Sequence, residues 1–187
     1  MKQLIYICIA LVAFAAPAQA NDARVLELVK SLEAQTKAWE ETMDANQQRQ
    51  LAAIRGHVAT VEAIRQADTD IRTAVKSCEK HNPDMKEPLQ TSLRNWTTAI
   101  EAHIKNSHPR LKQMVAGQTF AKQADVHKYI RDYKELVALQ DKKIKRIPIH
   151  GKDECEDLAE DIDDDSEEIN ELLQKALVLD KDLNYTE

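Results

Sequence analysis

A stripe of mostly apolar residues at helical spacing is the feature that most constrains the fold of this chain. Over residues 22–80 these positions recur at steps of three and four, which places them along one side of a helix. No proline occurs between Ala18 and Asn82, and the whole chain of 187 residues contains only three glycines. Because both residues interrupt helices, the sequence predicts an all-α fold that begins with an extra-long helix over 22–80.

Prolines and glycines divide the rest of the chain into three shorter predicted helices, over 84–108, 119–147 and 153–184. Short connections make neighbouring helices antiparallel, so the expected architecture is an up-down four-helix bundle with coiled-coil-like seams. Polar residues weaken the first stripe, which leaves open whether the first helix is continuous or broken near Asn46–Gly56. The expected seam of 119–147 includes Ala124, His127, Ile130 and Tyr133, and that of 153–184 includes Leu158, Ile162, Ile169 and Leu172.

The first twenty residues have the pattern of a secretory signal peptide. Met1-Lys2 is followed by an apolar run from Leu4 to Ala16 and by the small-residue sequence Ala18-Gln19-Ala20. The apolar run is too short for a membrane-spanning helix, and no second run of that character follows. We therefore expect one domain over 21–187, periplasmic or secreted, without membrane insertion after cleavage.

Cys78 and Cys155 are the two cysteines of that domain. In an oxidising compartment an even pair is most simply a disulfide. In the expected topology Cys78 closes the first helix and Cys155 opens the last, so both thiols lie at the same end of the bundle. The predicted disulfide and the predicted helix order therefore support each other.

Charge argues against two classes of partner. The chain has 26 basic and 32 acidic residues, a net charge of −6, which disfavours nucleic acid and anionic membranes. Twelve acids crowd residues 153–171. An EF-hand reading fails because Ser166 replaces the glycine and Leu172 the bidentate glutamate of a calcium loop. We interpret the acids as a solvated face beside the basic segment 142–146, with weak Ca²⁺ binding there as the alternative.

Three histidines suggest a second metal-binding alternative. Counting along the predicted helices places His57, His103 and His127 at a similar height in the bundle, which is the arrangement that a Zn or Cu site between helices requires. Only His127 lies on its expected seam, however, and a histidine beside a seam is more often a hydrogen-bonded boundary residue. His81, His108 and His150 fall in or beside predicted loops and suggest nothing together.

No pattern of catalytic residues is recognisable. The sequence contains no Gly-x-Ser-x-Gly turn and no glycine-rich phosphate loop, and its thiols are expected to be bonded to each other. We therefore expect a protein that is not an enzyme and that needs no cofactor.

An apolar face near the N-terminus suggests how such a protein functions. Aligning the last helix with the first from the cysteines leaves residues 22–49 without a partner in the chain. An apolar stripe in water is costly, so this segment either folds back as a separate helix or pairs with a protein partner or a second copy. The residues expected to bind the partner are Val25, Leu28, Val29, Leu32, Trp39 and Met43. The predicted function is a secreted scaffold, adaptor or chaperone-like binder, and the alternative is a metal-binding or metal-sensing bundle.

Overall fold

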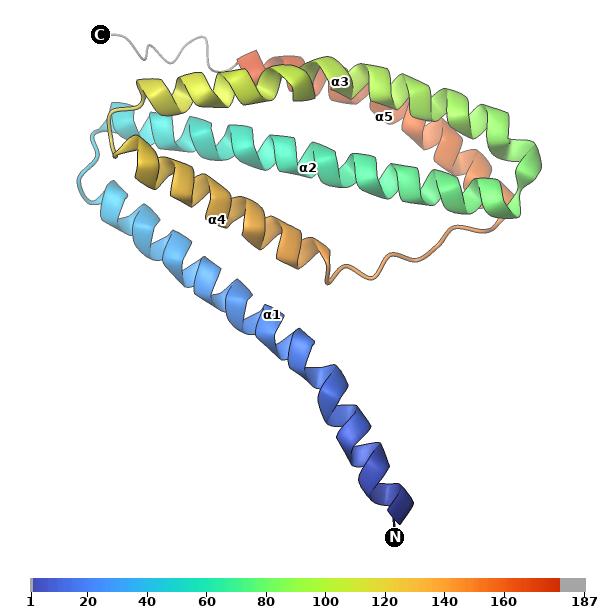
Figure 1. The fold of residues 1–187 in the computed structure, drawn as a ribbon. Coiled ribbons are helices and arrows are strands. Elements are labelled where there is room, and N and C mark those ends of the chain that lie inside the picture. Colours follow the sequence, from blue (N-terminus) through green and yellow to red (C-terminus); the bar gives the residue numbers. More distant parts are fainter. Residues whose placement is uncertain (1, 179–187) are drawn as a thin grey trace.

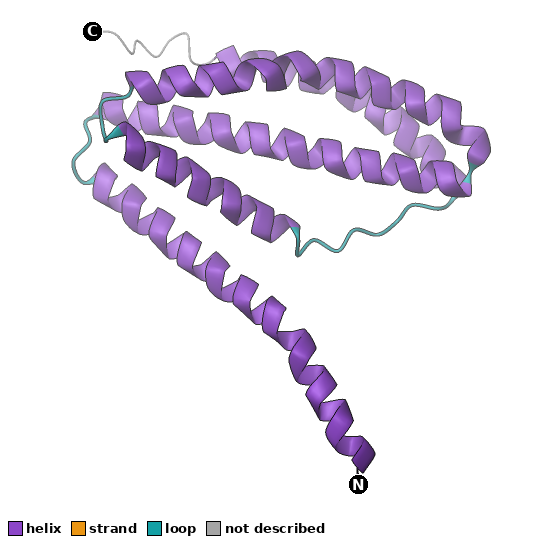
Figure 2. Ribbon diagram, in the orientation of Figure 1, coloured by secondary structure: helices purple, strands orange, loops and turns teal. Residues whose placement is uncertain are grey.

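The structure is a computed structural model that describes the backbone of residues 2–178 and the side chains of residues 21–173. Within that backbone it contains five α-helices, one short 3₁₀ helix and no strand (Figure 2). The elements in chain order are α1 Lys2–Glu40, α2 Ala45–His81, η1 Pro83–Met85, α3 Lys86–Gly117, α4 Gln123–Asp141 and α5 Lys152–Val178. The all-α prediction is confirmed.

α2 and α3 form a long antiparallel pair on which the other helices are arranged (Figure 1). α5 packs against one stretch of this pair, mainly on α3, whereas α4 packs against the other stretch and carries α1 on its far side. α5 and α4 thus cover different parts of the α2–α3 pair. This packing does not establish the single four-helix bundle that the sequence predicts.

The core beneath α5 contains the disulfide. Cys78 and Cys155 are fully buried and joined, with an S–S distance of 2.06 Å and a Cα–Cα distance of 5.8 Å. Around them pack apolar side chains from α2, η1, α3 and α5, among them Val75, Leu89 and Ile162. The bond therefore joins the end of α2 to the start of α5, the position expected from the sequence.

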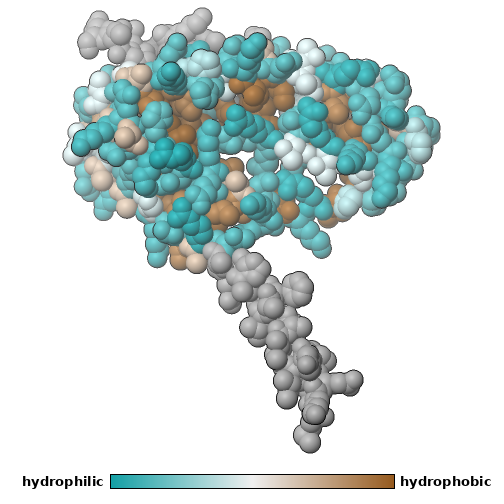
Figure 3. Space-filling model, in the orientation of Figure 1, coloured by the Kyte–Doolittle hydropathy of each residue, from teal (hydrophilic) through white to brown (hydrophobic). Residues whose placement is uncertain are grey.

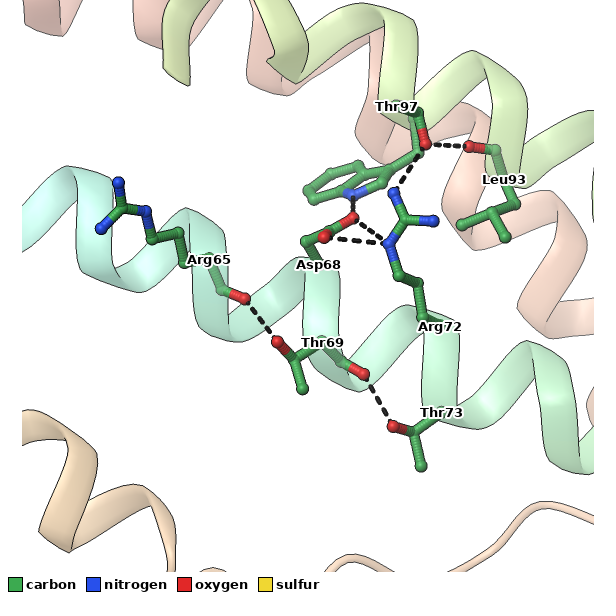
Figure 4. A network of polar contacts seen from close by, with 8 residues as sticks. Arg65, Asp68, Thr69, Arg72, Thr73, Leu93 and Thr97 are labelled. Carbon is green, nitrogen blue, oxygen red and sulfur yellow. Dashed lines mark hydrogen bonds and ion pairs between the residues drawn. The ribbon is translucent and has the colours of Figure 1, made fainter. Parts of the chain in front are cut away.

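A polar network joins α2 to α3 beside this core (Figure 4). Asp68 accepts hydrogen bonds from the indole nitrogen of Trp96 at 3.2 Å and from Arg72 at 3.0 Å. Arg72 also donates to the hydroxyl of Thr97 at 3.1 Å. Because each bond across the interface uses a side chain of defined length, the network stabilises one relative position of the two helices.

A second core lies where α4 covers the α2–α3 pair, and it changes the predicted end of the second helix. Met114 and Val115 of α3 are 2% and 1% exposed and pack against Ile54 and Val126. α3 therefore continues through Pro109 to Gly117 as a regular helix, whereas the sequence predicts that the regular helix ends near residue 108 and that only an irregular extension reaches Gly117. Proline inside a helix costs roughly 3 kcal/mol, and burial of this last stretch offsets that cost.

A single helix over 22–80 is wrong, because the chain breaks between Glu40 and Ala45, just before the range Asn46–Gly56 in which the sequence left a break open. Asp44 is the N-cap of α2 and forms a capping box: its carboxylate accepts from the amide of Gln47 at 2.8 Å, and the Gln47 side chain accepts from the Asp44 amide at 3.0 Å. This box starts a new helix. Gly56, the other proposed break point, lies inside α2.

The buried side of α5 also differs from the predicted seam. Leu173 is fully buried, whereas Leu172 is 56% exposed. Ser166, which was not part of the predicted seam, is buried, and its hydroxyl donates to the carbonyl of Ile162. Positions 155, 162, 166 and 173 follow the helical period of about 3.6 residues per turn. The predicted seam agrees with this side at Ile162 and, partly buried, at Leu158 and Ile169, and it departs from it at Leu172. The part of the predicted helix beyond residue 178 lies outside the described residues.

Candidate binding groove between α1 and α4

Aromatic contacts hold α1 on α4. Trp39 lies between two rings, with centroid distances of 5.3 Å to Phe120 and 5.3 Å to Tyr129. The contact with Phe120 is edge-to-face, an arrangement that the ring quadrupoles favour. Thr36, one turn before Trp39, also donates to the Tyr129 hydroxyl at 3.3 Å. These contacts bring the C-terminal part of α1 against the start of α4.

An ion pair holds the other end of the same interface. Arg24 of α1 donates two hydrogen bonds, of 2.8 and 2.9 Å, to the two carboxylate oxygens of Glu135 on α4. The bonds from Arg24 hold the pKa of Glu135 below its usual range, and the carboxylate in turn raises the pKa of Arg24. Both groups are solvent-exposed, so the pair contributes orientation more than stability.

A groove remains open along this interface, and we call it the α1–α4 groove. It encloses about 320 Å³ and is lined by side chains from α1, α4 and α2. Its apolar lining comes from Val29, Leu32, Tyr129, Tyr133 and Leu136. Glu33, Lys37, Glu40 and Arg55 contribute charged groups to the lining. An adjoining hollow of about 310 Å³ shares Glu40 and Arg55 with it.

The surface around these helices agrees with this description. Figure 3 shows apolar patches between hydrophilic side chains on the part of the molecule formed by α1 and α4. Leu26 of α1 is 54% exposed, although it lies only three residues before Val29 of the groove. A concave apolar lining with charged groups around it is the general form of a binding site.

The structure changes the expectation that α1 is uncovered. Leu28, Leu32 and Met43 are 1%, 7% and 9% exposed, so most of their surface is already covered within the chain. Val25, Val29 and Trp39 are half-buried. The segment has thus folded back as a separate helix, one of the two outcomes that the sequence left open, and α4 is the element that covers it.

Sequence reasoning found only part of the α4 side of the groove. Of the predicted seam of 119–147, Ile130 is buried and Tyr133 half-buried, whereas Ala124 and His127 are exposed. The buried residues are Val126, Tyr129 and Ile130, with Tyr133 half-buried after them. The sequence does contain a signal for this face. The four positions are spaced by three, one and three residues, which places them on one side of a helix, and two of them are tyrosines.

The structure does not bring His57, His103 and His127 together. The buried ring of His57 donates through Nε2 to the carbonyl of Ser107 at 2.9 Å, and His103 on α3 bonds to the side chain of Asn170 on α5 at 3.0 Å. His127 is exposed on α4. Among the side chains of residues 21–173, no three histidine, cysteine or acidic residues form a group that could hold a metal.

The basic segment 142–146 also has different partners from those expected. Arg146 pairs with Asp70 and Asp141, and Lys143 pairs with Asp22. In α5, Asp163 accepts from Ser92 and Asn95 of α3, at 2.8 Å each. These pairs therefore do not balance the acidic face of α5, which otherwise remains a face of mostly exposed carboxylates.

Comparison of the chain with protein-family models, with curated proteins and with solved structures finds no match. In the part of the chain that the structure describes, no helix has the length and apolarity needed to cross a membrane.

Proposed function

We propose that this chain is a non-enzymatic interaction protein that binds an amphipathic helix of a partner protein in the α1–α4 groove. The observation that carries the proposal is the open groove itself, where Val29 and Tyr133 line an apolar concavity between two helices. An amphipathic helix laid in a groove buries its apolar face there and leaves its polar face in solvent.

The charged residues around the groove favour a partner helix that carries both positive and negative side chains. Glu33 and Glu40 supply carboxylates, whereas Lys37 and Arg55 supply cations. Mixed charges of this kind set the orientation and the identity of the partner more than its affinity. The net charge of −6 makes nucleic acid and anionic membrane poor partners.

The proposed compartment is the periplasm or the extracellular space. Support comes from the signal-peptide pattern of residues 1–20 and from the buried Cys78–Cys155 bond, which persists in oxidising surroundings. N-terminal sequencing of the protein from an extracytoplasmic fraction should begin at Asn21. A protein that keeps residues 1–20 and stays in the cytoplasm would contradict this part of the proposal.

A matched pair of variants tests binding in the groove. Val29→Glu places a carboxylate in the apolar lining, whereas Leu172→Glu makes the same change on α5, outside this groove. We expect the partner recovered by the wild type to be recovered equally by Leu172→Glu and at least tenfold less by Val29→Glu. Equal recovery by Val29→Glu would contradict the proposal. Sedimentation of the purified chain shows whether the occupant is instead a second copy, which would appear as a dimer that Val29→Glu dissociates.

A further inference from the structure

Two histidines that are far apart in the sequence meet at the end of the molecule that contains the disulfide. His81 is the last residue of α2, and His150 lies in the connection just before α5. Their Nδ1 atoms are 3.2 Å apart, and their ring centroids are 4.3 Å apart at 65°. Both side chains are exposed, so an ion in solvent can reach them.

The neighbouring contacts hold the ring of His81 and the backbone of His150 in place. His81 Nδ1 is 2.8 Å from the carbonyl oxygen of Ser77, and because a carbonyl only accepts, this nitrogen carries the proton. His150 Nδ1 therefore presents its lone pair toward the same point. The side chain of Asn82 donates to the carbonyl of His150 at 3.0 Å, and the Cys78–Cys155 bond fixes the two helix ends that flank the pair.

We propose that His81 and His150 form a surface site for a divalent transition metal of the Cu²⁺ and Zn²⁺ class. Metal–imidazole bonds are about 2.0 to 2.1 Å long, so two such ligands at a tetrahedral angle lie about 3.3 Å apart, and at a right angle about 2.9 Å. The observed Nδ1–Nδ1 distance of 3.2 Å falls between these values. The two rings thus already have the separation that one metal ion requires.

The surroundings also favour a cation here. The backbone carbonyls at the end of α2 carry the negative end of the helix dipole, and His81 is the final residue of that helix. Water fills the remaining positions around the ion.

Binding requires only a change of tautomer. The proton leaves His81 Nδ1, its lone pair takes the metal, and Nε2 takes a proton from water, so the ring stays neutral and no redox step is involved. The hydrogen bond to Ser77 is lost, and two metal–nitrogen bonds replace it. Cu²⁺ should bind more tightly than Zn²⁺, since imidazole sites follow that order.

The test is a Cu²⁺ titration of the disulfide-intact chain, followed by calorimetry and by electron paramagnetic resonance. We expect one site with two imidazole nitrogens. His81→Gln and His150→Gln should each weaken that site at least tenfold, and the double variant should lose little more because either single change removes the chelate. His108→Gln is the matched control, as this exposed histidine on α3 lies outside the pair.

Circular dichroism melting in the presence of a chelator shows that each variant is folded. The proposal is overturned if His81→Gln and His150→Gln bind Cu²⁺ as the wild type does. It is also overturned if His108→Gln weakens binding as much as they do, because the metal would then bind surface histidines without selection. Neither result bears on the α1–α4 groove.

Discussion

Asp44 decides where the N-terminal helical region breaks, and the effect of one side chain there can be measured. Its carboxylate and the Gln47 side chain together satisfy amides at the start of α2 that would otherwise lack partners. We expect Asp44→Ala to lower the free energy of unfolding by about 1 kcal/mol, the usual effect of losing such a cap. Urea unfolding measures it, with Asp44→Asn as the control that keeps an accepting oxygen. Equal losses in both variants would mean that the cap is not the cause.

Glu135 offers a second test at the residue scale. Hydrogen bonds from Arg24 lower its pKa, so the stabilisation from this carboxylate is present above the ordinary carboxyl pKa and is lost as pH falls through the lowered value. We expect Arg24→Ala to move the pKa of Glu135 up toward its ordinary value in an NMR titration of the carboxyl carbon. Lys128→Ala serves as the control, since Lys128 pairs with Asp132 instead. An unchanged pKa in Arg24→Ala would show that the pair does not form in solution.

Among the elements, α1 should be the least firmly held, because its main contacts are with α4 alone. Trp39→Ala removes the ring that packs on Phe120 and Tyr129, and we expect a loss of about 2 kcal/mol, less than for a fully buried tryptophan. Hydrogen exchange should then show faster exchange in residues 21–40, with the amides of α2 and α3 near the disulfide unchanged. Uniform loss of protection across all helices would show instead that α1 unfolds only together with the rest.

Prediction from sequence succeeded for the elements whose boundaries local chemistry determines. The start of the last helix, predicted at residue 153 from the glycine and proline before it, lies within one residue of the observed start at Lys152. The end of α3 was missed because burial of Met114 and Val115 outweighs the local cost of Pro109. A break near Asn46–Gly56 was left open, and it lies just before that range, where Asp44 followed by Gln47 is the local signal for it. The seam of α5 was assigned to Leu172, whereas Leu173 is the buried residue.

At the scale of the whole molecule, the disulfide position followed from counting helices, because it depends only on where α2 ends and α5 begins. The α1–α4 groove did not, since it depends on how a separate α1 packs against another helix. The predicted face of α4 was also only partly correct, because it included Ile130 and Tyr133 but not Val126 and Tyr129. The contact between His81 and His150 could not be predicted either, because it depends on the path of the irregular connection before α5.

The disulfide should stabilise the whole fold. It closes a loop with a sequence separation of 77 residues, for which the chain-entropy relation gives roughly 4 kcal/mol less any strain. We expect the double variant Cys78→Ser, Cys155→Ser to have a free energy of unfolding lower by up to that amount in urea unfolding, under conditions where the wild type shows no free thiol. The wild type after reduction is the control. Free thiols in the untreated protein would contradict the bond itself.

The central claim is that a partner helix lies in the α1–α4 groove, and cross-linking from that groove tests it most directly. A photoreactive amino acid at position 37, in the groove lining, is compared with the same amino acid at position 168, on the exposed face of α5. We predict one cross-linked partner from position 37, with the contact mapped to an amphipathic helix, and none from position 168. The same partner captured equally from both positions, or only from position 168, would contradict the claim.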